Sequence, residues 1–235
     1  MILLPTLAAG AAAAVAGSLA TRHPRSAVFS PNIWRGHPGR RSVALTFDDG
    51  PSESTPELLR LLEQYNVPAT FFQVGHHARR LPEIARQVAQ RHEIGNHTDT
   101  HPALWLKSGT FIRDEVDRAQ ETLSAYAPVR WFRAPFGVRW FGLRPALARH
   151  RLTNVMWGVI GRDWTSLSGS AIADLVLAKP ASGLIVCLHD GRGLAEKPNI
   201  ANTIEAVRRL IPQLLERGCQ FETVSEIVRP QAPQR

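Results

Sequence analysis

From residue 42 onward, the chain alternates between two patterns of apolar and polar positions. Short continuous apolar runs predict buried strands. The stretches between them repeat apolar residues every three or four positions, which predicts helices with one buried face. The predicted strands cover residues 43–45, 70–74, 93–97, 130–133, 153–159, 183–188 and 221–224. The predicted helices cover residues 54–65, 81–91, 110–126, 143–149, 170–177 and 202–217. This alternation is typical of a parallel sheet with crossover helices.

Two α/β architectures, a doubly wound open sheet and a barrel, fit this alternation, and the polar residues favour the barrel. Candidate functional side chains follow the C-terminal ends of five predicted strands: Asp48, Asp49, His97, Arg133, Asp163 and His189. A closed or nearly closed barrel brings such strand ends into one mouth, where barrel active sites lie, whereas an open sheet would spread them apart. We therefore expect an irregular, incomplete (β/α) barrel of about seven parallel strands.

Two adjacent carboxylates, Asp48 and Asp49, stand where the first predicted strand ends, just before the strand-breaking pair Gly50-Pro51. Neighbouring like charges are unfavourable unless a cation or a proton lies between them. One carboxylate could therefore bind a metal ion while the other acts as a base. An Asp-rich turn without further function is the commoner meaning of such a pair when it stands alone.

His97 and His101 lie four residues apart in the run His-Thr-Asp-Thr-His. On a helical turn the two imidazoles would share a face, which is the spacing of a pair of metal ligands. Two surface histidines are the commoner explanation of this spacing alone. Together with Asp49 they would form a His-His-Asp set with open positions, as in catalytic metal sites, and such a set also suits non-haem iron.

Three further charged residues at strand ends suggest chemistry. Arg133 stands beside a proline turn, where its guanidinium could pair with a carboxylate such as Asp48 and fix its direction. Asp163 could orient a histidine or line a pocket. His189 ends the most apolar strand of the chain and could reach the barrel mouth as a general acid.

These motifs occur in a fixed order: TFDDGP, HxxxH after a Gly-Asn strand end, RxPFG, DW and LHDG. The ordered set resembles the five motifs of the polysaccharide deacetylases, the NodB-homology family or fourth carbohydrate esterase family. The resemblance covers about residues 41–227. It implies a distorted (β/α) barrel with one divalent metal ion, usually zinc, with Co2+, Ni2+ or Fe2+ as alternatives. It also implies metal-assisted removal of N-acetyl, or sometimes O-acetyl, groups from sugars.

The resemblance assigns a metal site and a base. The metal ligands would be Asp49, His97 and His101. Asp48 would be the base that activates water, and Arg133 would hold Asp48 in place.

It also assigns an acid and a pocket. His189 would protonate the leaving amine and Asp163 would tune His189. Trp164 and Leu188 would line the acetyl pocket, and the backbone N–H of Phe136 would help to stabilise the oxyanion. One departure is visible, because the family often has an acidic residue shortly before the Asp-Trp pair and residues 158–162 contain none. This departure could change the substrate groove.

Composition adds little to this picture. The chain has 28 Lys and Arg against 20 Asp and Glu, a formal net charge of +8 that could suit nucleic acid, an anionic membrane or an acidic cell wall. The basic residues are scattered, so the charge is weak evidence and we expect no nucleic-acid partner. Cys187 and Cys219 lack CxxC spacing, which excludes a cysteine zinc site. We expect two small core residues, with a disulfide as the alternative in an oxidising compartment.

The N-terminal part of the chain looks separable from the rest. Residues 1–20 are apolar and uncharged and predict a signal peptide, cleaved near Ala20, or a membrane anchor. Residues 21–40, rich in Pro and Arg, predict a linker or a loosely docked arm. Residues 41–229 form the predicted deacetylase domain and residues 230–235 a frayed tail. We expect an exported protein or one tethered at the cell envelope, with membrane contact through residues 2–20.

The leading hypothesis is therefore a metal-dependent hydrolase that removes N-acetyl groups from an acetylated glycan such as chitin oligomers or peptidoglycan. The bond broken would be a non-peptide carbon–nitrogen bond. One alternative keeps the metal site and hydrolyses a small non-sugar amide. An alternative from another class is a non-catalytic glycan-binding protein.

Overall fold

The computed structural model describes residues 17–230, which fold around one sheet whose paired strands all run parallel. The order across the sheet is β1-β6-β5-β4-β3-β2-β8-β7, and β9 pairs with β2. The strands are β1 (Asn32–Ile33), β2 (Ser42–Asp48), β3 (Thr70–Gln73), β4 (Glu93–Asn96), β5 (Trp131–Phe132), β6 (Thr153–Val155), β7 (Val159–Ile160), β8 (Leu184–His189) and β9 (Gln220–Phe221).

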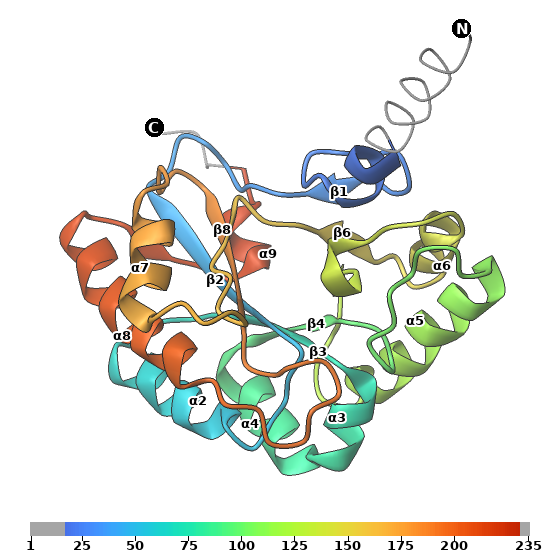
Figure 1. Ribbon diagram of the computed structural model, residues 1–235, viewed down its shortest axis with the longest axis horizontal. Helices are drawn as coiled ribbons and strands as arrows, with labels where there is room; N and C mark the ends of the chain where they lie inside the picture. Colours follow the sequence, from blue (N-terminus) through green and yellow to red (C-terminus); the bar gives the residue numbers. More distant parts are fainter. Residues whose placement is uncertain (1–16, 231–235) are drawn as a thin grey trace, which may run out of the picture.

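Helices follow one another around the outside of this curled sheet (Figure 1). They are α2 (Thr55–Gln64), α3 (Gly75–Arg80), α4 (Pro82–Arg91), α5 (Gly109–Ser124), α6 (Leu143–Arg149), α7 (Gly169–Leu177) and α8 (Ala201–Glu216). Two short helices are not part of this outer layer, the 3₁₀ helix η1 (Pro135–Gly137) and α9 (Val224–Ile227). Strands that alternate with helices on the outer face make an incomplete (β/α) barrel, which confirms the predicted architecture.

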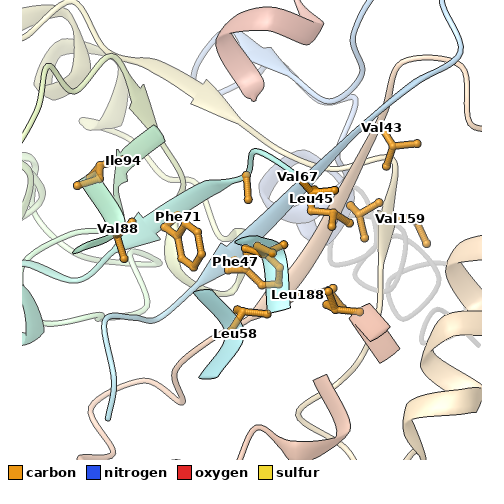
Figure 2. Close-up of a cluster of buried hydrophobic side chains, with 14 of the residues drawn as sticks. Val43, Leu45, Phe47, Leu58, Val67, Phe71, Val88, Ile94, Val159 and Leu188 are labelled. Carbon is orange, nitrogen blue, oxygen red and sulfur yellow. The ribbon is translucent and has the colours of Figure 1, made fainter. Parts of the chain in front are cut away.

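The side chains of β2 point alternately to the outer hydrophobic core and to the interior of the barrel. Val43, Leu45 and Phe47 point outward and pack in the main hydrophobic core between the sheet and the helices. Figure 2 shows this cluster, in which Phe47 lies beside Phe71 of β3. The intervening residues of β2 point into the barrel, and the last of them is Asp48. Successive side chains of a strand point to opposite faces, so one strand supplies both core packing and a functional carboxylate.

The barrel interior contains a second apolar cluster, which includes residues of the short helix α9. Val224 and Ile227 of α9 belong to it together with inward-facing residues near the start of their strands, such as Ala44 and Ile185. A capping box at Thr223 and Glu226 starts this short helix. Helix α9 therefore closes the bottom of the barrel, and the candidate functional residues lie at the opposite end.

The prediction of a single strand over residues 153–159 is wrong, because this segment contributes to two strands, β6 (Thr153–Val155) and β7 (Val159–Ile160). Strand β6 pairs with β5 and β1, whereas β7 pairs with β8 at the other end of the sheet order. Residues 156–158 cross the open side of the barrel between them. Their backbone N–H groups bond to strands on both sides of this opening, since Met156 donates to Ile33 of β1 and Gly158 donates to Ile185 of β8. An apolar run predicts buried extended chain but does not show which neighbour it pairs with.

The predicted linker or loosely docked arm is attached to the barrel at several points. Its residues 32–33 form β1, which pairs with β6. The buried guanidinium of Arg139 donates hydrogen bonds to the backbone carbonyls of Thr21, His23 and Ser26. Buried charged groups require such partners, so the arm completes the environment of Arg139.

Two further predictions concern the N-terminal stretch and the two cysteines. The apolar stretch at residues 2–20 lies almost entirely outside the described residues, and within residues 17–230 no helix is both long and apolar enough to cross a membrane. Cys187 and Cys219 are buried and both are free thiols.

Candidate active site

Strand register brings the predicted base and acid together. Asp48 on β2 and His189 on β8 are Cα partners in neighbouring strands, so both side chains project from the C-terminal ends of the strands into the barrel mouth. A pocket of about 360 Å³ opens there, and it is lined by Asp48, Asp49, His97, His101 and His189 among others. Three segments that are far apart in the sequence therefore meet in one cavity.

Asp49 lies one residue beyond β2, in a left-handed conformation with φ of 72°. Its Oδ1 atom is 2.9 Å from Nε2 of His101 and 3.3 Å from Nε2 of His97. Burial opposes ionisation of Asp49, but the neighbouring imidazoles of His101 and His97 outweigh it and hold the pKa of this carboxyl well below its ordinary value. Asp49 is therefore ionised, as a metal ligand must be.

The orientation of His97 provides a test of whether these residues suit a cation. Nδ1 of His97 donates to the backbone carbonyl of Arg133, 2.7 Å away, because a carbonyl oxygen can only accept. With this proton on Nδ1, the lone pair on Nε2 of His97 faces the carboxylate of Asp49. Two acceptors that face one another need a cation between them, either a proton or a metal ion. One carboxylate oxygen and two imidazole nitrogens are a suitable donor set for a divalent transition metal.

The loop that carries the two histidines is not helical, and the prediction of a helical turn is wrong. Thr98 and His101 have positive φ angles of 67° and 55°. Hydrogen bonds fix the loop instead, since Oγ1 of Thr98 accepts from the N–H of His101 and the side chain of Asn96 accepts from the N–H of Thr98. The buried carboxylate of Glu115 on α5 accepts from two further backbone N–H groups in the loop. These local bonds bring the imidazoles together without a helix.

Arg133 binds the carboxylate of Asp48, as the sequence analysis predicted. Oδ1 accepts a hydrogen bond from Nη1 of Arg133 at 2.7 Å. Nη1 also donates to Thr46, and the guanidinium lies over the ring of Phe72. The second oxygen, Oδ2, has a weak contact of 3.4 Å from the thiol of Cys187. One oxygen of the carboxylate is thus fixed while the other remains available at the pocket.

His189 and Asp163 form a second fixed pair. Nδ1 of His189 lies 2.8 Å from Oδ1 of Asp163, while Oδ2 accepts from the backbone N–H of His189 and from the hydroxyl of Thr203. Burial lowers the pKa of His189, but the charge and hydrogen bond of Asp163, together with the charges of Asp49 and Asp48, outweigh it and raise the pKa to about 9. His189 is therefore protonated at neutral pH, with Nδ1–H directed at Asp163.

Two of the three predicted pocket residues lie at the pocket. Phe136, at φ of 57° in η1, is 63% exposed and packs its ring against His101. Trp164 is 48% exposed and packs edge-on against His189. The prediction for Leu188 is wrong, because its side chain is fully buried in the outer core. Alternation along β8 points Leu188 outward and Cys187 and His189 inward.

Six residues that sequence reasoning missed also line the pocket: Gly137, Trp157, Ile160, Cys187, Arg192 and Gly193. Two-residue alternation with His189 was a signal for Cys187, and Arg192 and Gly193 directly follow the LHDG run. Trp157 and Ile160 carried no comparable signal, because their position depends on the split between β6 and β7. Thr203, from α8, was also missed.

The sequence of this chain has recognisable relatives. A family model of the polysaccharide deacetylases matches residues 35–155. A chitooligosaccharide deacetylase from Sinorhizobium fredii (strain NBRC 101917 / NGR234) is 42% identical over 194 residues, which are 78% of this chain and 90% of that protein.

Solved structures show the same architecture. A peptidoglycan N-acetylglucosamine deacetylase superposes with a TM-score of 0.77 at 30% identity, covering 86% of this chain and 95% of the other. A CE4 family pseudoenzyme from Bacillus anthracis superposes with a TM-score of 0.76 at 28% identity, covering 86% and 70%. The fold alone therefore does not distinguish an active enzyme from an inactive one, and that distinction rests on the side chains in the pocket.

Proposed function

The chain belongs to the polysaccharide deacetylase family, and from this premise we propose that it is a metal-dependent hydrolase acting on N-acetylated glycans. The proposed substrates are N-acetylglucosamine oligomers of the chitin type or peptidoglycan strands. The reaction breaks the carbon–nitrogen bond of the acetamido group and yields acetate and a free amine. O-acetyl groups bound in the same way would be a secondary substrate.

The observation that supports this proposal is the meeting of three functional sets in one pocket. The first is the His-His-Asp donor set, the second is Asp48 with Arg133, and the third is His189 with Asp163. A glycan-binding protein without catalysis has no physical need for a buried base and a polarised acid beside the metal donors.

Asp49, His97 and His101 are the residues that would hold a divalent ion, and zinc suits their nitrogen and oxygen atoms. Such an ion, when bound, supplies Lewis-acid polarisation of the acetyl carbonyl and favours ionisation of water at neutral pH. The chain itself supplies the remaining functions, namely binding the substrate, orienting the reacting groups and moving protons.

Proton movement is assigned to the two fixed pairs. Oδ2 of Asp48 accepts the proton of the attacking water while Arg133 keeps Oδ1 in place. Nε2 of His189 donates a proton to the departing nitrogen as the carbon–nitrogen bond breaks. Asp163 keeps the Nδ1–H of His189 directed toward itself, so that Nε2 faces the pocket throughout. The backbone N–H of Phe136 is proposed to bind the oxyanion of the tetrahedral intermediate.

A single experiment separates this function from its alternatives. The purified chain is loaded with zinc and assayed for metal content and for acetate release from N-acetylglucosamine oligomers. Bound metal with acetate release supports the proposal. Metal without release from any glycan favours a small-amide hydrolase, and glycan binding without metal or release favours a non-catalytic protein such as the pseudoenzyme that it resembles.

We also propose that the protein acts at the cell envelope, exported or tethered through its apolar N-terminal segment. The support is the sequence of residues 2–20 and the location of polymeric N-acetylated glycans outside the cytoplasm. Cell fractionation with sequencing of the mature N-terminus tests this. An intact Met1 on a protein recovered from the cytoplasm would contradict both versions.

A further inference from the structure

Helix α3 lies behind the candidate metal site and is bonded to the loops that build it. The backbone N–H of Val74, just before the helix, donates to Gly50, which follows the two aspartates. The N–H groups of Gly75 and His76 donate to the carbonyls of Thr98 and Asp99, between the two histidine ligands. The first residues of this short helix therefore fix both segments that supply ligands.

His77, on the same helix, reaches a third loop. The residue is 1% exposed, and its Nε2 lies 2.8 Å from the backbone carbonyl of Gly193 in the loop between β8 and α8. Because a carbonyl oxygen can only accept, Nε2 of His77 carries the proton and donates. Nδ1 of His77 has no hydrogen-bond partner within the part of the chain that the structure describes.

Gly193 connects His77 to Asp49, one of the proposed metal ligands. Its N–H donates to Oδ2 of Asp49 at 2.8 Å, while Oδ1 of Asp49 faces the two imidazoles. Gly193 has a positive φ of 53°, and a Cβ at this position would lie 3.5 Å from Nδ1 of His101. The peptide groups on either side of Gly193 thus link His77 to the carboxylate oxygen that is turned away from the metal position.

We propose that His77 is a positioning residue for the metal site, acting through Gly193 to hold Asp49 in the orientation that binds metal through Oδ1. Without the donor on His77, the loop at Gly193 is free to shift and the carboxylate of Asp49 is free to rotate. Partners of this kind, one step removed from the ligands, typically change metal affinity by about 10- to 100-fold. The inference rests on the proposed metal dependence.

The test compares His77→Phe, which keeps a ring without a donor, with His77→Gln, whose side-chain amide can donate in a similar place. His76→Phe is the matched control, since His76 is the exposed neighbour on the same helix. Zinc affinity of the full chain is measured by competition with a chromophoric chelator, and the thermal midpoint of the metal-free protein is measured alongside. We expect His77→Phe to weaken zinc binding by about 10- to 100-fold, His77→Gln to restore most of it and His76→Phe to change nothing.

Several outcomes would overturn the inference. Equal zinc affinity in wild type and His77→Phe would do so, as would an equal loss in His77→Phe and His77→Gln. If His77→Phe does not fold, His77→Met replaces it, and failure of both to fold would show that His77 supports the fold and not the site. A wild-type chain that binds no divalent ion would overturn the proposed function as well, which distinguishes that failure from the others.

Discussion

Nη1 of Arg133 donates to Oδ1 of Asp48 across 2.7 Å, and both side chains are buried. The same guanidinium donates to the carbonyls of Val155 and Met156 on the far side of the barrel. Arg133 therefore spans the interior from β2 to β6 and fixes the proposed base to both walls. A rigid base needs no reorganisation when it accepts a proton, which is the advantage of a preorganised site.

Replacing Arg133 by Met should lower the free energy of unfolding by about 3–5 kcal/mol, because the carboxylate of Asp48 would remain buried without its partner. Urea unfolding monitored by circular dichroism measures this. The double variant Arg133→Met/Asp48→Asn should recover part of the loss, since it removes the unpaired charge. Arg86→Met, at an exposed ion pair with Glu83, is the control and should cost less than about 1 kcal/mol. A loss at Arg133 no larger than at Arg86 would contradict the prediction.

The acid–base assignment predicts that Asp48→Asn and His189→Ala each lower turnover by roughly 100-fold or more while the metal stays bound. Each change removes a proton-transfer group but no proposed metal ligand. Acetate release from N-acetylglucosamine oligomers and metal analysis of the same samples provide the two measurements. Turnover close to wild type in either variant would exclude that residue from the proposed role.

The pKa of His189 predicts the alkaline limit of activity. An acid must be protonated to act, so turnover should fall as the pH rises through a pKa that Asp163 helps to raise to about 9. Asp163→Asn removes this negative charge and should move the alkaline limb of the pH–turnover profile to lower pH. A limb at the same pH in both proteins would indicate that another group controls it.

Replacing His97 by Ala should remove most of the bound metal and leave the fold intact, because the site lies at the barrel mouth and not in the hydrophobic core. Metal content after dialysis and the circular dichroism spectrum check the two parts of this expectation. His76→Ala is a suitable control at an exposed histidine. Full occupancy in His97→Ala would sink the assignment of this ligand.

His92 predicts how stability depends on pH. Its ring packs against Phe71, and burial, with a smaller effect of Arg91, lowers its pKa from 6.5 to about 4. The unfolded chain binds a proton at His92 below about pH 6.5 and the folded chain only below about pH 4. The free energy of unfolding is therefore not reduced by His92 above about pH 6.5, and it decreases as the pH falls from 6.5 toward 4.

His92→Phe should remove this loss, which amounts to about 1–2 kcal/mol at pH 5 relative to pH 8. Denaturant unfolding at both pH values, for the variant and the wild type, measures the difference. An identical decrease in stability for the two proteins would assign the acid sensitivity to other groups.

The ends of the strands were predictable, because an apolar run that is followed by a polar residue marks where a buried strand ends. The polar residue then lies at the C-terminal end of that strand, where barrel active sites lie. Asp48, Arg133 and His189 were located in this way, and β2, β5 and β8 bring them together. The ordered motifs then allowed the family to be identified before the fold was known.

Features that depend on non-local pairing were not predictable. Residues 153–159 divide into β6 and β7 because the first part pairs with β5 and the last part pairs with β8. An apolar run does not indicate the strand with which each of its residues pairs. Helix α3, which carries His77, has no apolar periodicity to mark it. The loop that carries His97 and His101 is shaped by hydrogen bonds to Asn96 and Glu115. The spacing of residues along the sequence does not indicate which side chains these bonds involve.

Arg139 determines how much of the N-terminal segment the folded protein can lose. Its buried guanidinium donates to the carbonyls of Thr21, His23 and Ser26, all of which lie after the predicted cleavage point at Ala20. Processing at that point would release the apolar segment and leave every one of these acceptors in place. Trimming the chain back to residue 41, where the resemblance to the family begins, would remove all three acceptors of Arg139 and also the pairing of β1 with β6. We therefore expect a stable truncated form to keep the chain from about residue 21 onward, some twenty residues before the strand that carries Asp48.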